Sequence, residues 1–408
     1  MAFVIIYLAL TACFSFTRPM VGLVFAANAF LFGSLNAKFG GSSELISVAG
    51  PLLCFFAIAL KSILICKSIA IPRDKVGFLL IALGILFLAS ALYSGMPSVS
   101  AEYAARYFFL GISFYFFAKI AHTLYQDQAT YHRDASFGLY AIGALLTGIA
   151  LFYQDSSSQY VMRLAIGSAS SIPLAISLGL AILAGCSYLL RAHNFRLMLL
   201  HGSIILIIGY AFIATNTRSV TIGIIIASTY LIAYERLKNI NTRSLYSIAS
   251  IGAIVFAAVY FISLNSEFVE RLTSGFERVL TRDYGESESS RVDAWNHALS
   301  LFLENPFSGI GAGTFEKIHG IYAHNIILEI MAENGIPGLA IFLPILLITI
   351  YEIKKQTKST TRAQVAALIF VLIVSQVSLT LWMHKFLFIF LATTTSPPKK
   401  THNKASRI

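Results

Sequence analysis

The chain has 408 residues, of which 57% are hydrophobic and 12% are charged, with a mean hydropathy of +0.75. Roughly a quarter of the residues in a soluble globular domain are charged, so this composition excludes that class. The net charge of +11 would suggest a nucleic-acid partner. However, the Lys and Arg residues lie mostly in short loops between apolar runs, where membrane topology accounts for them, and we expect no nucleic-acid partner.

Repeated apolar runs predict an all-α polytopic membrane protein, because backbone polar groups in lipid must find their partners within helices. About 12 transmembrane helices are predicted. Their ranges are 2–16, 19–35, 44–60, 76–94, 103–121, 137–153, 172–190, 197–214, 219–234, 246–264, 325–350 and 364–392. The first two form either a broken helix or a shallow hairpin at Arg18 and Pro19. The last is either one tilted helix or two short ones.

The charges of the loops predict which side each one faces. Five alternate loops are rich in Lys and Arg, and by the positive-inside rule they face the cytoplasm. They are 61–75, 122–134, 191–196, 235–243 and 352–362. The intervening loops 95–102, 154–171, 215–218 and 265–323 face the opposite side. The expected division is a transmembrane bundle at 1–264, a loop domain at 265–323, further transmembrane helices at 324–395 and a basic cytoplasmic tail at 396–408.

The polar segment 265–323 is too long for a plain connector. Its part from Arg291 to Glu304 predicts a helix, which the Asn-Pro pair at 305–306 ends. Glycines at 309, 311 and 313 then permit a tight turn. The spacing of these glycines does not fit a dinucleotide-binding fingerprint. Contact between their backbone N–H groups and a phosphate is left open.

Four basic or titratable residues map to the outer face: Arg163, Arg218, Arg291 and His324. Each also has a structural interpretation. Arg218 could extend to the membrane interface, Arg291 could form a surface ion pair, and His324 could simply begin a helix. Together, several cations and one imidazole near a membrane surface suit a lipid-linked diphosphate and a hydroxyl that must lose a proton.

Several other kinds of chemistry have no motif in the sequence. There is no P-loop, no Ser-His-Asp pattern and no metal-ligand spacing, and the four cysteines all lie in or at the ends of apolar runs. We therefore expect neither a metal nor any other cofactor. The energy for a reaction would come from an activated donor.

Four runs resemble the O-antigen ligase / O-antigen polymerase family. They are Ser-Arg-Val-Asp-Ala-Trp at 290–295, Asn-Pro-Phe-Ser-Gly-Ile-Gly-Ala-Gly-Thr-Phe at 305–315, Ala-His-Asn-Ile-Ile-Leu-Glu at 323–329 and Glu-Asn-Gly-Ile-Pro-Gly-Leu at 333–339. The Thr-Arg-Ser at 217–219 is similar to the family's arginine at the start of the helix pair before the large periplasmic loop.

The resemblance implies a multi-pass glycosyltransferase of the bacterial inner membrane, with its active site on the periplasmic side. Such an enzyme uses an undecaprenyl-diphosphate-linked glycan, inverts the configuration at the transferred sugar, and needs neither metal nor nucleotide. By matching motif, Arg291 and Arg218 hold the diphosphate, and His324 acts as the base toward the acceptor hydroxyl or orients it. His324 and Arg291 are the expected catalytic residues. Arg218, Arg163 and Asn325 are the expected substrate-binding residues.

Three acceptors are open within this family. A ligase transfers the glycan to lipid A–core, a polymerase to another lipid-linked repeat unit, and a protein O-oligosaccharyltransferase to Ser or Thr. One large loop in a compact chain favours the ligase, because polymerases often carry two sizeable periplasmic loops. Outside the enzyme class, a lipid-linked glycan transporter would typically show internal repeats and polar residues at mid-membrane, which are not evident. The remaining alternative is that 265–323 is a structural cap for assembly.

Overall fold

A computed structural model of the chain describes residues 2–69, 74–153, 164–166, 170–192, 194–236, 286–355 and 362–395. Within these ranges the protein is helical and has no strand, which confirms the all-α fold. The predicted span 246–264, the loop residues 265–285, the tail 396–408 and Arg163 lie outside the described residues.

Within each described range the helices follow one another with short connections. The first group is α1 (Ala2–Thr17), α2 (Pro19–Ala27), α3 (Ala29–Lys38), α4 (Ser43–Cys66), α5 (Lys75–Ser90), α6 (Pro97–Arg106), the π-helical segment η1 (Tyr107–Ile112) and α7 (Ser113–Thr123). The second is α8 (Gln128–Phe152), α9 (Ser171–Arg191), α10 (Phe195–Ala214) and α11 (Arg218–Arg236). The third is α14 (Glu286–Glu304), α15 (Thr314–His319), α16 (Ile326–Lys355), α17 (Arg362–Val374), the 3-10 turn η3 (Leu381–Met383) and α18 (Lys385–Thr394).

Six helical stretches of the described chain are long and apolar enough to cross a membrane. They are Ser43–Cys66, Pro97–Thr123, Gln128–Phe152, Ser171–Arg191, Phe195–Ala214 and Ile326–Lys354. The bent pair α2 and α3 would make a seventh. Shorter apolar helices lie at most of the other predicted spans, among them Lys75–Ser90 and Arg218–Leu231. The protein is therefore a multi-pass membrane protein, while the count of about 12 spans stays a prediction.

Several predicted spans are broken. Helices α2 and α3 meet at Asn28 with a bend of 51°, so the predicted span 19–35 is itself broken, at a different place from the expected junction at Arg18 and Pro19. The stretch 364–392 contains α17 and α18 with a turn between them, so it forms two short helices. Helix α16 is kinked at Gly335, whose φ of 60° and ψ of −153° are not helical. A β-carbon at Gly335 would lie 2.5 Å from the carbonyl oxygen of Pro306, so only glycine fits at this kink.

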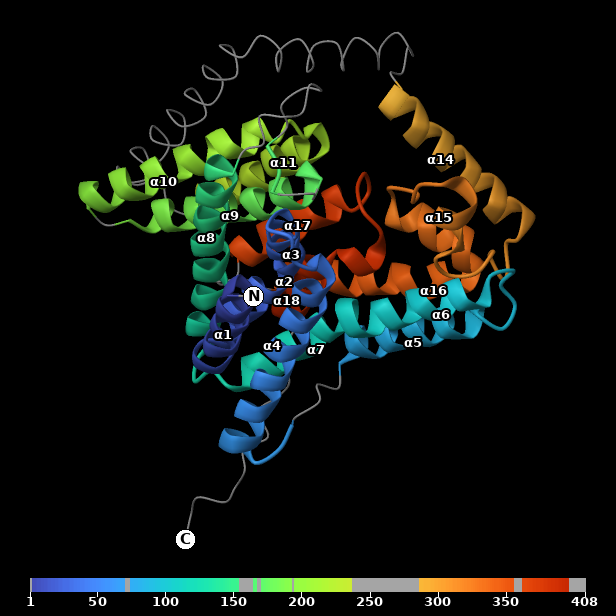
Figure 1. Cartoon of the computed structure of the whole chain (residues 1–408), viewed down its shortest axis with the longest axis horizontal. Coiled ribbons are helices and arrows are strands. Elements are labelled where there is room, and N and C mark those ends of the chain that lie inside the picture. Colours follow the sequence, from blue (N-terminus) through green and yellow to red (C-terminus); the bar gives the residue numbers. More distant parts are fainter. Residues whose placement is uncertain are drawn as a thin grey trace.

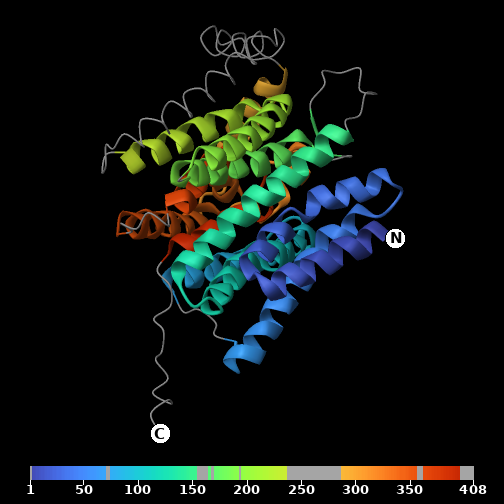
Figure 2. The same ribbon diagram turned by 90° about the vertical axis from the view of Figure 1, so that its left-hand side faces the viewer.

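Helices distant in sequence pack side by side. In Figure 1, α14 and α15 lie together at one end of the molecule, next to α16 and the paired α5 and α6. Helices α9, α10 and α11 form a second group, and α17 joins them to α18 in the centre. Figure 2 shows the long helix α8 running diagonally between α10 and α11 on one side and the N-terminal helices on the other. Helix α16 packs against α5, α14 and α15 in the first group and against α18 in the centre.

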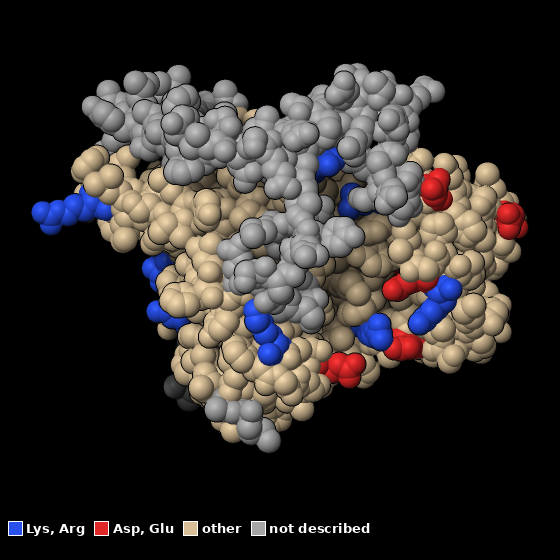
Figure 3. All heavy atoms as spheres, turned by 45° about the horizontal axis from the view of Figure 1, so that its top comes forward, with Lys and Arg blue, Asp and Glu red and all other residues tan. Residues whose placement is uncertain are grey.

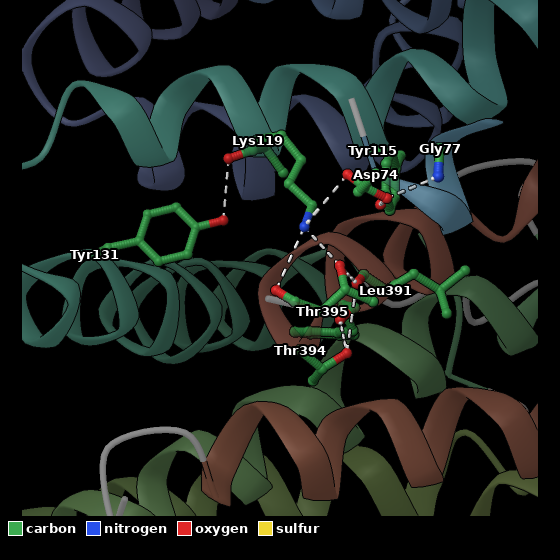
Figure 4. A network of polar contacts seen from close by, with 10 residues as sticks. Asp74, Gly77, Tyr115, Lys119, Tyr131, Leu391, Thr394 and Thr395 are labelled. Atoms are coloured by element: carbon green, nitrogen blue, oxygen red, sulfur yellow. Dashed lines mark hydrogen bonds and ion pairs between the residues drawn. The ribbon is translucent and has the colours of Figure 1, made fainter. Parts of the chain in front are cut away.

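A buried ion pair fixes the end of α18. The ammonium of Lys119, which is 1% exposed, donates to the hydroxyl of Thr395 at 2.6 Å and lies 3.7 Å from the carboxylate of Asp74 (Figure 4). Asp74 also caps α5 by accepting from the Gly77 amide at 2.8 Å, and it accepts from the hydroxyl of Tyr115. A buried charge is tolerated only with such partners. The network therefore ties the end of α18 to α7 and to the start of α5.

Candidate functional site

Helix α14 carries Arg291 and packs against the segment just before His324. Its buried face presents Ala294 and Ala298, which pack with Phe315 and Ala323 in a small apolar cluster. Small side chains on this face let the two segments approach closely. The indole N–H of Trp295 donates to the carbonyl oxygen of Ala323 at 3.0 Å. Helix α14 begins at Glu286, five residues earlier than the predicted start at Arg291.

His324 has an unusual backbone and an aromatic neighbour. Its φ of 55° lies in the left-handed region, which non-glycine residues adopt rarely and often at functional sites. Its ring centroid lies 4.3 Å from that of Tyr322. The Nδ1 atom is buried and has no hydrogen-bond partner within the described part of the chain. Burial first, and then the positive charge of Arg291, lower the pKa of His324 to about 4. The structure thus brings Arg291 and His324 together and leaves the imidazole neutral at pH 7.

Asn325 begins helix α16. Its side-chain oxygen accepts from the amides of Ile327 at 3.0 Å and Leu328 at 3.1 Å, which is an N-cap arrangement. The amide of the next residue, Ile326, donates to the carbonyl oxygen of Ser375 at 3.2 Å. This cap fixes the backbone next to His324 at the N-terminus of α16. The predicted contact of Asn325 with substrate stays a prediction.

Arg218 is the first residue of α11 and is half-buried. The neighbouring Ser219 hydroxyl lies 3.5 Å from that of Ser378, and Ser375 in the same loop holds the start of α16. The loop 375–380 therefore connects the helix of Arg218 with the helix that follows His324. A role of the Arg218 side chain at the candidate site stays a prediction.

Backbone strain collects around the same loop. The described chain contains four non-glycine residues with positive φ: Lys67, Asn216, His324 and Leu379. Three of them belong to this region, because Asn216 lies two residues before Arg218 and Leu379 lies within loop 375–380. Such conformations persist only where the surroundings enforce them.

A buried carboxylate that sequence reasoning missed holds this region together. Glu329, 3% exposed, lies one turn into α16 and accepts a hydrogen bond from the hydroxyl of Tyr103 in α6 at 2.6 Å. It also accepts from the hydroxyl of Thr380, which ends loop 375–380. An acidic residue in the first turn of an apolar helix was the available signal. Its partners could not be found from sequence spacing.

The glycine-rich turn is packed into the protein. The amides of Ile310 and Gly311 donate to the carbonyl oxygens of Ala332 at 3.0 Å and Glu333 at 2.9 Å. The amide of Ala312 donates to the Ser90 hydroxyl at 2.9 Å. Because these N–H groups already have partners, the turn has a structural role and they are not open to a phosphate. It docks residues 309–312 beside the kink of α16.

The space-filling view shows the face that carries these elements. In Figure 3, basic and acidic side chains are mixed on the right-hand side of this face, while most of the remaining described surface is uncharged. Among the described residues no three His, Cys, Asp or Glu side chains are grouped closely enough to hold a metal ion.

These features define a multi-pass helical membrane protein with a polar site made by α14, the start of α16 and loop 375–380. Residues 202–343 match the family model described as O-Antigen ligase. This central third of the chain includes Arg218, Arg291, His324 and Asn325, and the match confirms the resemblance to the O-antigen ligase/polymerase family. The family points to a membrane glycosyltransferase-like enzyme. A search of curated proteins found no match.

Proposed function

We propose that the protein is an O-antigen ligase of the bacterial inner membrane, which transfers an undecaprenyl-diphosphate-linked glycan to lipid A–core at the periplasmic face. The observation that carries the proposal is the proximity of Arg291 to the half-buried imidazole of His324, whose pKa lies well below its ordinary value. The site lies next to helices that are long and apolar enough to span a membrane. A cation for an anionic leaving group and a base for a hydroxyl are the two groups that glycosyl transfer from a diphosphate needs.

In the proposed reaction, an acceptor hydroxyl oxygen attacks the anomeric carbon of the donor glycan. The bond between that carbon and the diphosphate oxygen breaks, undecaprenyl diphosphate leaves, and the configuration inverts. Arg291 and Arg218 neutralise the charge that grows on the diphosphate. The imidazole of His324 takes the hydroxyl proton, which its lowered pKa permits at neutral pH. Arg163 is assigned to the same substrate from its position in the sequence.

One experiment separates this proposal from its alternatives. The purified protein is mixed in detergent, without ATP, with a defined undecaprenyl-diphosphate glycan and each of three acceptors: lipid A–core, a second lipid-linked repeat, and a protein rich in Ser and Thr. Transfer to lipid A–core supports the ligase. Transfer only to the lipid-linked repeat would establish a polymerase instead, and transfer only to the protein would establish a protein glycosyltransferase. Absence of any transfer, with movement of the donor across vesicles, would establish a transporter.

A further inference from the structure

Arg106 is a charged residue within a stretch that could cross the membrane. It ends α6, inside the apolar range Pro97–Thr123. Its guanidinium lies 5.2 Å from the ring centroid of Trp382, and it forms an ion pair with Glu102 one turn earlier. Its side chain is 49% exposed. An arginine in such a segment is costly, and it commonly marks a site for an anionic group.

This arginine is connected to the candidate site from two directions. Tyr103, three residues earlier on α6, donates to Glu329 on the helix that follows His324. Trp382 follows Thr380 by two residues, and Thr380 donates to the same carboxylate. The Arg106–Trp382 pair therefore lies beside the elements that hold His324.

The helix changes character directly after Arg106. Residues Tyr107–Ile112 form the π-helical segment η1, which packs against η3, the turn that contains Trp382. A π-helical turn inside an α-helix redirects the side chains that follow it, and such turns are frequent at functional sites.

A similar cluster elsewhere in the chain shows what distinguishes Arg106. Arg18 is also half-exposed, lies over an aromatic ring (Phe137, 5.5 Å), and pairs with a carboxylate (Asp134, 4.0 Å). Asp134, however, is buried and accepts a further hydrogen bond from Tyr125. The partner of Arg106, Glu102, is 58% exposed. An exposed ion pair contributes little free energy, so an incoming anion can replace Glu102 at small cost.

We propose that Arg106 and Trp382 form a binding site for the phosphate of a membrane lipid, next to the Arg291–His324 site. The guanidinium lies over the indole ring in a cation–π contact, and its N–H groups, one of which now contacts Glu102, would bind phosphate oxygens. The diphosphate of the glycan donor is the expected ligand, and to that extent this inference rests on the proposed function. A phospholipid headgroup presents the same chemistry, and the experiment has an arm for each.

The test measures lipid binding by the full chain in nanodiscs of phosphatidylcholine, with no acceptor present. One arm titrates undecaprenyl diphosphate without a glycan, and the other titrates phosphatidylglycerol. Arg106→Ala should weaken binding of the ligand by about tenfold, the effect of one charge-assisted contact. Arg106→Lys should keep part of the affinity, which also shows that the loss does not come from misfolding. Trp382→Ala should weaken it by a smaller factor. Arg18→Ala is the matched control and should leave binding unchanged.

The arm that responds identifies the lipid. The proposal would be overturned if Arg106→Ala bound both lipids as tightly as the wild-type protein does. It would also be overturned if Arg18→Ala lost as much affinity as Arg106→Ala, or if the wild-type protein bound neither lipid. The assay involves no transfer. If the wild-type protein transfers glycan but Arg106→Ala binds lipid as the wild type does, only this lipid site is rejected. If lipid binding depends on Arg106 but the wild-type protein transfers no glycan, only the proposed function is rejected.

Discussion

The indole N–H of Trp295 donates a hydrogen bond to the carbonyl oxygen of Ala323, at 3.0 Å, immediately before His324. Trp295 lies one helical turn after Arg291 on α14. This hydrogen bond, together with the packing of Ala294 and Ala298 against Ala323, joins the helix that carries the arginine to the backbone that carries the histidine. The relative position of the two proposed catalytic groups depends on it.

Replacing Trp295 with Phe should impair transfer more than it impairs folding. The ring keeps most of its packing, and the loss of one hydrogen bond costs about 1 kcal/mol. The carbonyl oxygen of Ala323, just before His324, loses its hydrogen-bond donor. We therefore expect the transfer rate to fall at least tenfold, while the melting temperature changes by only a few degrees. Ser300→Ala, at an exposed position on the same helix, is the control and should change neither. An unchanged rate in Trp295→Phe would contradict this role.

The pKa of His324 gives a direction for the pH dependence. It is about 4 in the folded protein, against an ordinary value of 6.5, because of burial and the charge of Arg291. The neutral base form therefore persists at pH 7, and transfer should stay level down to about pH 5 and fall as the pH approaches 4. The unfolded chain binds a proton at higher pH than the folded chain does, so stability should decrease as the pH falls from 6.5 toward 4.

Removing the charge of Arg291 should raise the pKa of His324. Arg291→Gln removes the second cause of the shift but leaves burial, so the value should increase and still lie below 6.5. NMR titration of ring-labelled histidine measures this without requiring activity. An identical titration curve in the variant and the wild type would show that Arg291 does not influence the imidazole.

The Glu329 carboxylate should tolerate only a replacement that keeps an acceptor. Glu329→Leu would remove the acceptor that the buried hydroxyls of Tyr103 and Thr380 share. Because these two hydroxyls lie 3.2 Å apart, one can still donate to the other, and the one left unsatisfied should cost about 1–3 kcal/mol. Glu329→Gln keeps an oxygen for both, so we expect most of the stability and activity to remain. Thermal unfolding and transfer rate measure the two effects, with Glu304→Gln at an exposed position as the control. If Leu and Gln behave alike, the carboxylate has no such role.

Substitutions at two glycines distinguish the effect of steric crowding on stability from the effect of backbone conformation. Gly309 and Gly320 both have positive φ, at 64° and 86°. A β-carbon at Gly309 would lie 2.3 Å from the carbonyl carbon of Glu333, whereas at Gly320 it would meet nothing within 4 Å. Gly320→Ala should therefore cost only the conformational strain, about 1–2 kcal/mol. Gly309→Ala should lose considerably more stability in thermal unfolding, because it also detaches the turn from α16. Equal losses would mean that the turn is not docked there.

The sequence predicted the parts of the structure that depend on local pattern. Apolar runs located most of the helices, and the Asn-Pro pair correctly placed the end of α14. The partners of Glu329 lie 226 and 51 residues away, and the Trp295 contact spans 28 residues, so no periodicity could reveal them. The phosphate contact left open for the glycine-rich turn is not available, because its amides bond inside the protein. The count of spans depends on helices too short to be assigned by length alone.

The central claim is that Arg291 and His324 act together on a lipid-linked glycan, and a transfer assay with the purified protein tests it most directly. Wild type, His324→Ala, Arg291→Ala and the control Arg18→Ala are compared in detergent with an undecaprenyl-diphosphate glycan and lipid A–core. We expect transfer by the wild type and Arg18→Ala, and none by the other two variants at equal melting temperature. Near-normal transfer by His324→Ala and Arg291→Ala would contradict it.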